Sequence, residues 1–300
     1  MAKNFNANKR KLEDLELQAT KIREDIVKSL EKAGSGHSAG PLGLADIFTA
    51  LYFDVMRHDP KDPTWELRDI LILSNGHCAP VLYTSLAHAG YFDRDELWTL
   101  RKFGSRLQGH PERERLPGVE TTSGPLGSGL SQACGMALAM MMNKQSHRWI
   151  YCVMGDGEQN EGNVWEAAML ASKYNLHNVI AITDRNNIQI DGTTEYVMPL
   201  EDLRAKWESF GWHVIEIDGN NIDAFIDAAA MGRAIVEKPV MIIAHTIPGK
   251  GVDFMENDYH WHGIPVGIED VAGAPPKNEQ AKVALEELRT LEGKIRNEHE

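Results

Sequence analysis

The first part of the chain carries apolar residues at the spacing of a helix. Between positions 12 and 33 an apolar residue recurs every three or four positions, which predicts an amphipathic helix with one buried face. These positions are Leu12, Leu15, Ala19, Ile22, Ile26, Leu30 and Ala33. Gly34 then predicts the end of the helix, because glycine readily takes the left-handed conformation found just past helix ends. A loop over 35–40 and a second, largely buried helix over 42–56 are expected next.

Beyond position 69, short apolar runs alternate with helical patterns. The apolar runs predict strands at 69–74, 149–154, 178–183, 213–217 and 239–245. The expected helices cover 79–89, 130–142, 163–174, 200–210, 222–236 and 276–300. Strands that alternate with helices predict an α/β fold, a parallel sheet with helices on both faces. Ligands of such sheets bind beyond the carboxyl ends of the strands.

Two segments differ from this alternation. The stretch from Leu100 to Ser128 is rich in glycine, proline and arginine and has no clear period, which is typical of a long functional loop. The charged, amphipathic pattern of 276–300 predicts a C-terminal helix that serves packing or solvation. We therefore expect one domain over 1–275, which includes the helix 12–33, followed by the helix 276–300.

Composition narrows the class of protein. The chain has 300 residues and a formal net charge of -13, which argues against a nucleic-acid-binding surface. No apolar stretch approaches the length of a membrane span, and the polar, basic residues 1–11 do not form a secretory signal. Cys78, Cys134 and Cys152 lie in apolar surroundings without metal-binding spacing, which favours buried, reduced thiols and a cytoplasmic location.

A pair of short polar motifs follows two of the predicted strands. Gly155-Asp156-Gly157 closes the second strand, and Asn186-Asn187 follows the third. If these strands are neighbours, the Asp156 carboxylate and the Asn186 amide oxygen lie close together, and the Ile188 carbonyl can add a third oxygen. Magnesium prefers such ligands together with phosphate oxygens and water. A simple turn explains a lone Gly-Asp-Gly equally well, but the strand context and the paired asparagines favour a site for a cation bound to phosphate.

Four histidines lie beside glycines in predicted loops: His37, His77, His110 and His262. Zinc binding is one interpretation, because histidine is the commonest metal ligand. The separations are long, however, and no cysteine or HExxH pattern accompanies them. A histidine-lined pocket for a polyhydroxylated substrate is the preferred interpretation, because imidazoles both donate and accept hydrogen bonds and can transfer protons.

A series of ordered motifs over most of residues 30–267 gives the chain a specific resemblance to transketolase, in its N-terminal, thiamine diphosphate-binding part. The motifs are Ser35-Gly36-His37, Leu73-Ser74-Asn75-Gly76-His77, Gly109-His110-Pro111-Glu112, Thr122-Ser123-Gly124-Pro125-Leu126-Gly127-Ser128-Gly129, Gly155-Asp156-Gly157, Asn186-Asn187-Ile188 and His262-Gly263. The fold implied is the thiamine diphosphate-binding fold. Many members of the family have proline where Ser38 stands, which leaves the shape of that loop open. The segment 249–257 resembles the branch of the family in which the enzyme consists of separate halves.

The resemblance implies ligands for the cofactor. Asp156, Asn186 and the Ile188 carbonyl match the residues that bind magnesium, for which calcium or manganese can substitute. Gly157 and His77 match contacts to the diphosphate. Residues that match the aminopyrimidine side of the cofactor are Gly124, Pro125 and Leu126.

The resemblance also implies residues for catalysis. His37, His110 and His262 match histidines that hold the hydroxyls of the donor sugar and assist proton transfer. His262 lies beside the cofactor in the family and is expected to do the proton work. Glu161 matches a glutamate that links one active site to the other across the dimer interface.

The chain ends after one diphosphate-binding domain and a tail, at about half the length of a single-chain transketolase. In the family, the glutamate that protonates the cofactor's pyrimidine and the arginines that grip the sugar phosphate belong to the other half. The resemblance therefore implies the N-terminal subunit of a split transketolase, inactive alone. The expected partner carries the pyrimidine-binding and C-terminal domains in an α2β2 assembly.

The reaction implied is transfer of a two-carbon ketol unit from a ketose to an aldose acceptor. The sugars are expected to be phosphates or sulfonates, in the pentose phosphate pathway or a specialised route of carbohydrate metabolism. Two alternatives stay open. An α subunit of a 2-oxo acid dehydrogenase shares the diphosphate motif but needs no set of loop histidines. A non-catalytic, cofactor-binding scaffold subunit needs neither Asp156 nor the histidines.

Overall fold

The structure, a computed structural model, describes residues 12–144 and 147–299. The start of the predicted domain and the stretch judged not to be a secretory signal, residues 1–11, lie outside the described residues. The predicted parallel sheet is confirmed. Its strands are β1 (Ile70–Leu73), β2 (Ile150–Gly155), β3 (Val179–Arg185), β6 (His213–Asp218) and β7 (Val240–His245), in the order β1-β2-β3-β7-β6. β2 and β3 are parallel neighbours, with Gly155 opposite Asp184, so the two polar motifs meet at one edge of the sheet.

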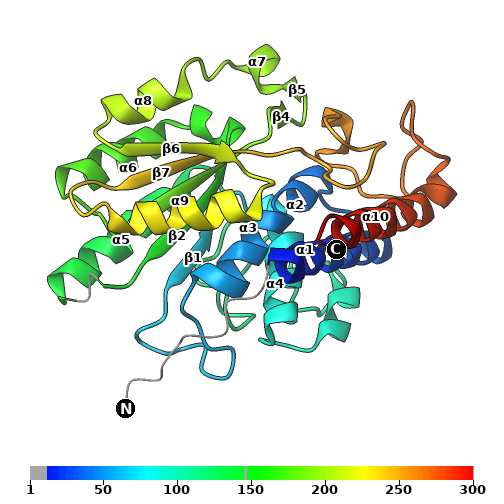
Figure 1. The fold of residues 1–300 in the computed structure, drawn as a ribbon, viewed down its shortest axis with the longest axis horizontal. Helices are drawn as coiled ribbons and strands as arrows, with labels where there is room; N and C mark the ends of the chain where they lie inside the picture. The colour runs from blue at the N-terminus through cyan, green and yellow to red at the C-terminus, as the bar shows by residue number, and fades with distance from the viewer. Residues whose placement is uncertain (1–11, 145–146, 300) are drawn as a thin grey trace.

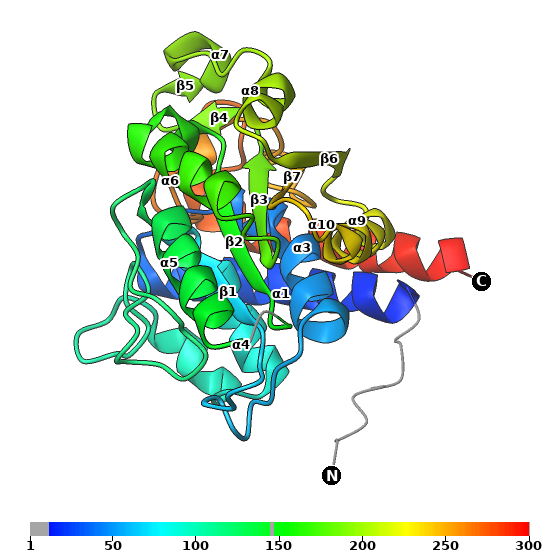
Figure 2. The same ribbon diagram turned by 90° about the vertical axis from the view of Figure 1, so that its left-hand side faces the viewer.

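Helices cover both faces of the sheet, as the alternating pattern predicts (Figure 1). The longer helices are α1 (Leu12–Ala33), α4 (Ala79–Ala89), α5 (Ser128–Met142), α6 (Gly162–Lys173), α8 (Leu203–Ser209), α9 (Ile222–Ala234) and α10 (Lys277–His299). Figure 2 shows the sheet between α5 and α6 on one side and α3 (Ala45–Ala50) and α9 on the other.

Alternate residues of each strand point to opposite faces, which creates two cores. Leu71, Tyr151 and Ile182 pack with α1, α3, α4 and α9. Ile72, Cys152 and Ala181 pack with α5, α6 and α8 on the other face. β1, β2, β3 and β7 are mostly apolar and buried on both sides, which explains why they read as continuous apolar runs in the sequence. The three cysteines are free and buried, as predicted.

The predicted single helix over 42–56 is wrong in detail. The chain instead forms α2 (Ala39–Gly43), α3, and a π-helical turn η1 (Leu51–Val55). The backbone of Ile247 lies close to Gly43, since a Cβ there would come within 2.9 Å of the Ile247 carbonyl oxygen. This contact with a distant segment coincides with the break between α2 and α3, and local periodicity does not reveal it.

Several short elements are absent from the sequence-based prediction. β4 (Ile188–Gln189) and β5 (Gly192–Thr193) form a small antiparallel hairpin, and α7 (Thr194–Val197) follows it. Elements of two to four residues leave no periodic signal. Three 3₁₀ turns flank the site: η2 (Gly76–Cys78), η4 (Gly157–Asn160) and η5 (Tyr259–Trp261); a fourth, η3 (Arg94–Thr99), precedes the long loop.

Two regions lie outside the alternation of strands and helices. The stretch between Leu100 and Gly127 is irregular and includes several buried residues. α10 lies along α1 (Figure 1), and Leu288 of α10 belongs to the same core as α1. Among the described residues, no helix has both the length and the apolarity needed to cross a membrane.

Candidate active site

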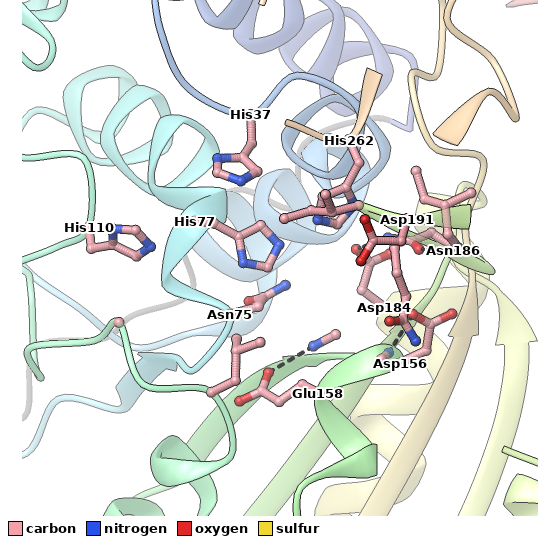
Figure 3. A pocket seen from close by; sticks show the side chains of 17 residues that line it. His37, Asn75, His77, His110, Asp156, Glu158, Asp184, Asn186, Asp191 and His262 are labelled. Atoms are coloured by element: carbon pink, nitrogen blue, oxygen red, sulfur yellow. Dashed lines mark hydrogen bonds between the residues drawn. The ribbon is translucent and has the colours of Figure 1, made fainter. Parts of the chain in front are cut away.

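A cavity of about 430 Å³ lies at the carboxyl ends of the strands. Segments far apart in the sequence line it, because parallel strands all end at this edge. The predicted site residues that line it are His37, His77, His110, Gly124, Leu126, Asp156, Gly157, Asn186, Ile188 and His262. Figure 3 shows His37, His77 and His262 gathered at one side and Asp156, Asp184 and Asn186 at another.

Two predicted site residues do not line the cavity. Pro125 stands between two residues that do, Gly124 and Leu126. Glu161 is exposed at the N-cap of α6, with its side chain close to Gly127. The position of Glu161 is compatible with contact to another subunit, but its predicted role stays a prediction.

The acidic side of the cavity is organised around Asp156, which is 1% exposed. One carboxylate oxygen accepts the Gly157 N–H at 2.7 Å. The other accepts the Asn187 N–H at 2.7 Å and lies 3.2 Å from a guanidinium nitrogen of Arg185. Burial raises the pKa of Asp156 to about 6, although these donors lower it.

A second buried carboxylate, Asp184, lies beside Asp156. It accepts a hydrogen bond from the Thr246 hydroxyl and another, at 2.8 Å, from the side-chain N–H of Asn186. This bond orients the Asn186 amide, whose oxygen accepts the Ile188 N–H at 3.1 Å. Burial raises the pKa of Asp184 to about 7, and the charge of Asp156 raises it too.

Two buried carboxylates with raised pKa values are compatible with a site for a cation. Desolvation and mutual repulsion disfavour their charged forms, and a divalent cation held by Asp156 would reduce both penalties. In the part of the chain that the structure describes, no three His, Cys, Asp or Glu side chains converge as ligands of one metal ion. A cation here would therefore combine a carboxylate with amide and backbone oxygens, a donor set that suits magnesium.

The opposite side of the cavity is a triangle of imidazoles. The ring centroids of His37 and His77 are 4.9 Å apart, those of His77 and His262 5.2 Å, and those of His37 and His262 5.6 Å. His110 is exposed and stands apart (Figure 3). The Ser38 hydroxyl donates a hydrogen bond of 2.9 Å to the Ile264 carbonyl, so it ties the His37 loop to the His262 loop.

Burial of these histidines favours their neutral form. Burial lowers the pKa of His37 to about 4, with further lowering by His262, His110 and Arg101. Burial also lowers the pKa of His77 and of His262. A neutral imidazole has one donor and one acceptor nitrogen, so the cluster can donate hydrogen bonds to a polyol and also accept them from it.

Hydrogen-bonding capacity is left over at this cavity. The Nδ1 atoms of His37 and His262 and the Oδ1 atom of Asn75 are buried without a hydrogen-bond partner. Buried polar atoms are normally paired, and exceptions often mark a place for a ligand or water. A Cβ at Gly124 would meet no protein atom within 4 Å, so glycine there keeps the cavity open rather than relieving a clash.

Sequence reasoning missed several residues of the site. Glu158, Asp184 and the stretch 189–191 also line the cavity, and so does Asn75, which belongs to a recognised motif but was given no role. The others each stand within three positions of a recognised motif. Proximity to such a motif is therefore the signal that would have found them.

Comparison with known proteins agrees with this geometry. The family model described as "Transketolase, thiamine diphosphate binding domain" matches residues 16–279. The chain is 45% identical over 255 residues to one of the subunits of apulose-4-phosphate transketolase from Phocaeicola vulgatus, covering 85% of this chain and 90% of that protein. It is 44% identical over 256 residues to 6-deoxy-6-sulfo-D-fructose transketolase subunit SqwG of Clostridium sp., covering 85% and 93%.

A solved structure gives the same likeness in three dimensions. The transketolase of Pichia stipitis, crystallised with sedoheptulose-7-phosphate, superposes with a TM-score of 0.81 at 32% identity. The match covers 96% of this chain but 45% of that one. The chain thus spans nearly the whole of the two relatives that are subunits and less than half of this solved transketolase.

Proposed function

The chain belongs to the transketolase family, and from that premise we propose that it is the thiamine diphosphate- and magnesium-binding subunit of a split transketolase. The complete enzyme transfers a two-carbon ketol unit from an anionic ketose to an aldose acceptor. The single observation that carries the proposal is one cavity in which the Asp156–Asn186 pair faces the histidine triangle. A scaffold subunit needs neither half of that cavity, and a 2-oxo acid dehydrogenase subunit needs no such histidines.

The acidic side holds the cofactor's phosphate tail. Asp156 and Asn186, with the Ile188 carbonyl, are the proposed magnesium ligands. Gly157 and His77, both lining the cavity, contact the diphosphate. The buried pair Asp156 and Asp184 supports this assignment, because their raised pKa values favour a bound cation.

The segment Gly124–Leu126 is proposed to lie along the aminopyrimidine side of the cofactor. Gly124 and Leu126 line the cavity, and Pro125 fixes the backbone between them. When bound, thiamine diphosphate supplies a carbanion centre and an electron sink for the breaking carbon–carbon bond.

The histidines act on the substrate. His37 and His110 orient the hydroxyls of the donor by hydrogen bonds, and His262 takes and returns the hydroxyl proton while the carbon–carbon bond breaks and re-forms. A neutral imidazole is required to take the proton, because only the neutral ring can accept one. Support comes from burial, which lowers the pKa of His37 and of His262 and so favours the neutral ring.

A partner subunit completes the active site. The chain covers 90% and 93% of two relatives that are named as subunits, and 45% of a single-chain transketolase. We propose that the partner carries the pyrimidine-binding and C-terminal domains in an α2β2 assembly, with Glu161 at the contact between active sites. Residues 1–275 form the cofactor-binding domain, and 276–300 form a helix attached to it. The complex works in carbohydrate metabolism in the cytoplasm.

The substrate is an anionic ketose. The two relatives named above act, by their names, on apulose-4-phosphate and on 6-deoxy-6-sulfo-D-fructose. Both are sugars with a strong anion at the far end from the ketol group. Phosphate and sulfonate demand the same cationic contacts, which are proposed to come from the partner.

The experiment is to co-purify the complex through a tag on this chain and to assay ketol transfer. A panel of phosphorylated and sulfonated ketoses is offered with aldehyde acceptors, in the presence of thiamine diphosphate and magnesium. We expect transfer from at least one anionic ketose by the complex and none by the chain alone. Decarboxylation of a 2-oxo acid without ketol transfer would overturn the proposal, and so would full transfer activity of the chain alone.

A further inference from the structure

We propose that Glu158 is a positioning residue that holds the two halves of the cofactor seat together. The halves are the phosphate turn, defined here as Gly155–Gly157, and the head segment, defined as Gly124–Gly127. This inference rests on the proposed function where it concerns the cofactor. Its geometric part is that one carboxylate bridges two segments of the site, and this part does not depend on the cofactor.

The Glu158 carboxylate is buried at 3% exposure and lines the cavity (Figure 3). It accepts three hydrogen bonds from three separate segments. The Gly127 N–H donates to Oε1 at 2.7 Å, and the Gly155 N–H donates to Oε2 at 3.0 Å. The Ser74 hydroxyl, at the end of β1, donates to Oε1 as well.

Ser74 extends this network to the start of α5. Its hydroxyl oxygen accepts the Gly129 N–H at 3.0 Å. Glycine is needed at positions 127 and 129, because a side chain at either position would be too close to a neighbour. A Cβ at Gly129 would lie 2.4 Å from the Ser74 side chain, and one at Gly127, where φ is +80°, would lie 2.8 Å from the Glu161 Cβ.

The two halves depend on Glu158 to different degrees. The phosphate turn has other supports, because the Asp156 N–H donates to the Asp184 carbonyl at 3.2 Å and β2 is held in the sheet. The head segment lies at the end of the irregular stretch, and Gly127 donates its N–H to Glu158. Loss of the carboxylate should therefore release the head segment and leave the phosphate turn nearly in place.

The substitution Glu158→Leu tests this directly. Leucine keeps a similar volume and has no acceptor atom, so the N–H groups of Gly127 and Gly155 both lose their carboxylate partner. Glu237→Leu is the matched control, because Glu237 is exposed between α9 and β7.

Hydrogen–deuterium exchange on the full chain without cofactor gives the first readout. We expect the Gly127 amide to exchange about tenfold faster in Glu158→Leu, the effect of losing one hydrogen bond to a charged group. Exchange in Glu237→Leu should match the native chain. Unchanged exchange at Gly127 in Glu158→Leu would overturn the proposal. If Glu158→Leu does not fold, Ser74→Ala replaces it: faster exchange at Gly129 and Gly127 with Gly155 unchanged supports the network, and no change refutes it.

Calorimetric binding gives the second readout, with magnesium present throughout. Glu158→Leu should weaken thiamine diphosphate binding about tenfold and inorganic diphosphate binding less than about twofold, because the other contacts of the phosphate turn persist. Equal weakening of both ligands would indicate general structural damage and contradict a positioning role. If the native chain, with and without its partner, binds no thiamine diphosphate, the proposed function fails, while the exchange result still decides the geometric part.

Discussion

At one side of the cavity, Asp156, Asp184 and Asn186 are buried and linked by hydrogen bonds to the ends of β2 and β3. At the other side, His37, His77 and His262 come from loops, and two of them keep a buried nitrogen without a partner. The polar groups of the acidic side thus have hydrogen-bond partners, but positive charge does not fully balance its carboxylates. The histidine side is electrically neutral but short of hydrogen-bond partners.

This difference indicates which ligand each side receives. A shortage of positive charge favours a cation together with the phosphate that it binds, as proposed for the cofactor. A shortage of hydrogen-bond partners calls for hydroxyls, which arrive and leave with each substrate. Cofactor binding and substrate turnover should therefore respond separately to changes at the two sides.

The largest effect is expected from Asp156→Ala on the acidic side. It removes the proposed carboxylate ligand of magnesium and leaves Arg185 and Asp184 without their neighbour. Ketol transfer by the complex should fall by at least about a thousandfold, because cofactor affinity is lost with the cation. Calorimetry should show thiamine diphosphate binding reduced beyond detection. Asp227→Ala, at an exposed position of α9, is the control, and retained cofactor binding in Asp156→Ala would refute the assignment.

His262→Ala on the histidine side should separate turnover from cofactor affinity. Loss of a proton-transferring imidazole lowers kcat by about a hundredfold. Thiamine diphosphate affinity should change by no more than about threefold, because the acidic side and the phosphate turn are untouched. Steady-state kinetics and calorimetry on the same preparation measure the two quantities. A parallel collapse of both would mean that the two sides are not independent.

A smaller effect is expected from Ser38→Ala, which cuts the hydrogen bond between the two histidine-bearing loops. Loss of about 1 kcal/mol there should raise KM for the ketose by about threefold to fivefold, with kcat within twofold. The substitution adds no bulk. An unchanged KM would show that packing alone sets the separation of His37 and His262.

The smallest effect concerns stability against pH. His37 is neutral in the folded chain down to about pH 4, while an unfolded histidine binds a proton below about pH 6.5. Between these values the unfolded state binds more protons, so stability falls as pH is lowered through that window. The Tm of His37→Gln should therefore depend less steeply on pH between 6.5 and 4 than that of the native chain. His147→Gln, which replaces a histidine at an exposed position, is the control. His77, His262 and His110 lie around His37, and burial lowers their pKa values too, so they contribute to the rest of the slope. The charge of Arg101 helps to lower the pKa of His37.

The acidic side was predictable from sequence because its residues follow strands directly. Asp156 and Asn186 meet because β2 and β3 are parallel neighbours, which the apolar runs and the alternation with helices already suggest. The sequence did not identify Asp184 as a site residue, although it stands two residues before Asn186. Its raised pKa depends on how deeply it is buried in the sheet, and local sequence patterns do not predict that depth.

The histidine side was predictable as a set of residues but not as a geometry. Gly–His pairs in loops marked His37, His77 and His262, and the structure brings their rings within 5.6 Å of one another. The Ser38–Ile264 hydrogen bond joins positions 226 residues apart, so no local pattern encodes it. The Glu158 bridge was missed for the same reason, because its donors come from three segments of the chain. Contacts of this kind arise from the folded arrangement rather than from periodicity.

We propose that this chain binds the diphosphate end of the cofactor and that a partner subunit is needed to activate the reactive ring end. The most direct test is the exchange of the C2 proton of thiamine diphosphate into deuterated water, followed by NMR, with the chain alone and with the co-purified partner. We predict magnesium-dependent binding by the chain alone with exchange close to that of the free cofactor, and acceleration by at least about a hundredfold when the partner is added. Equal acceleration by the chain alone would contradict the account.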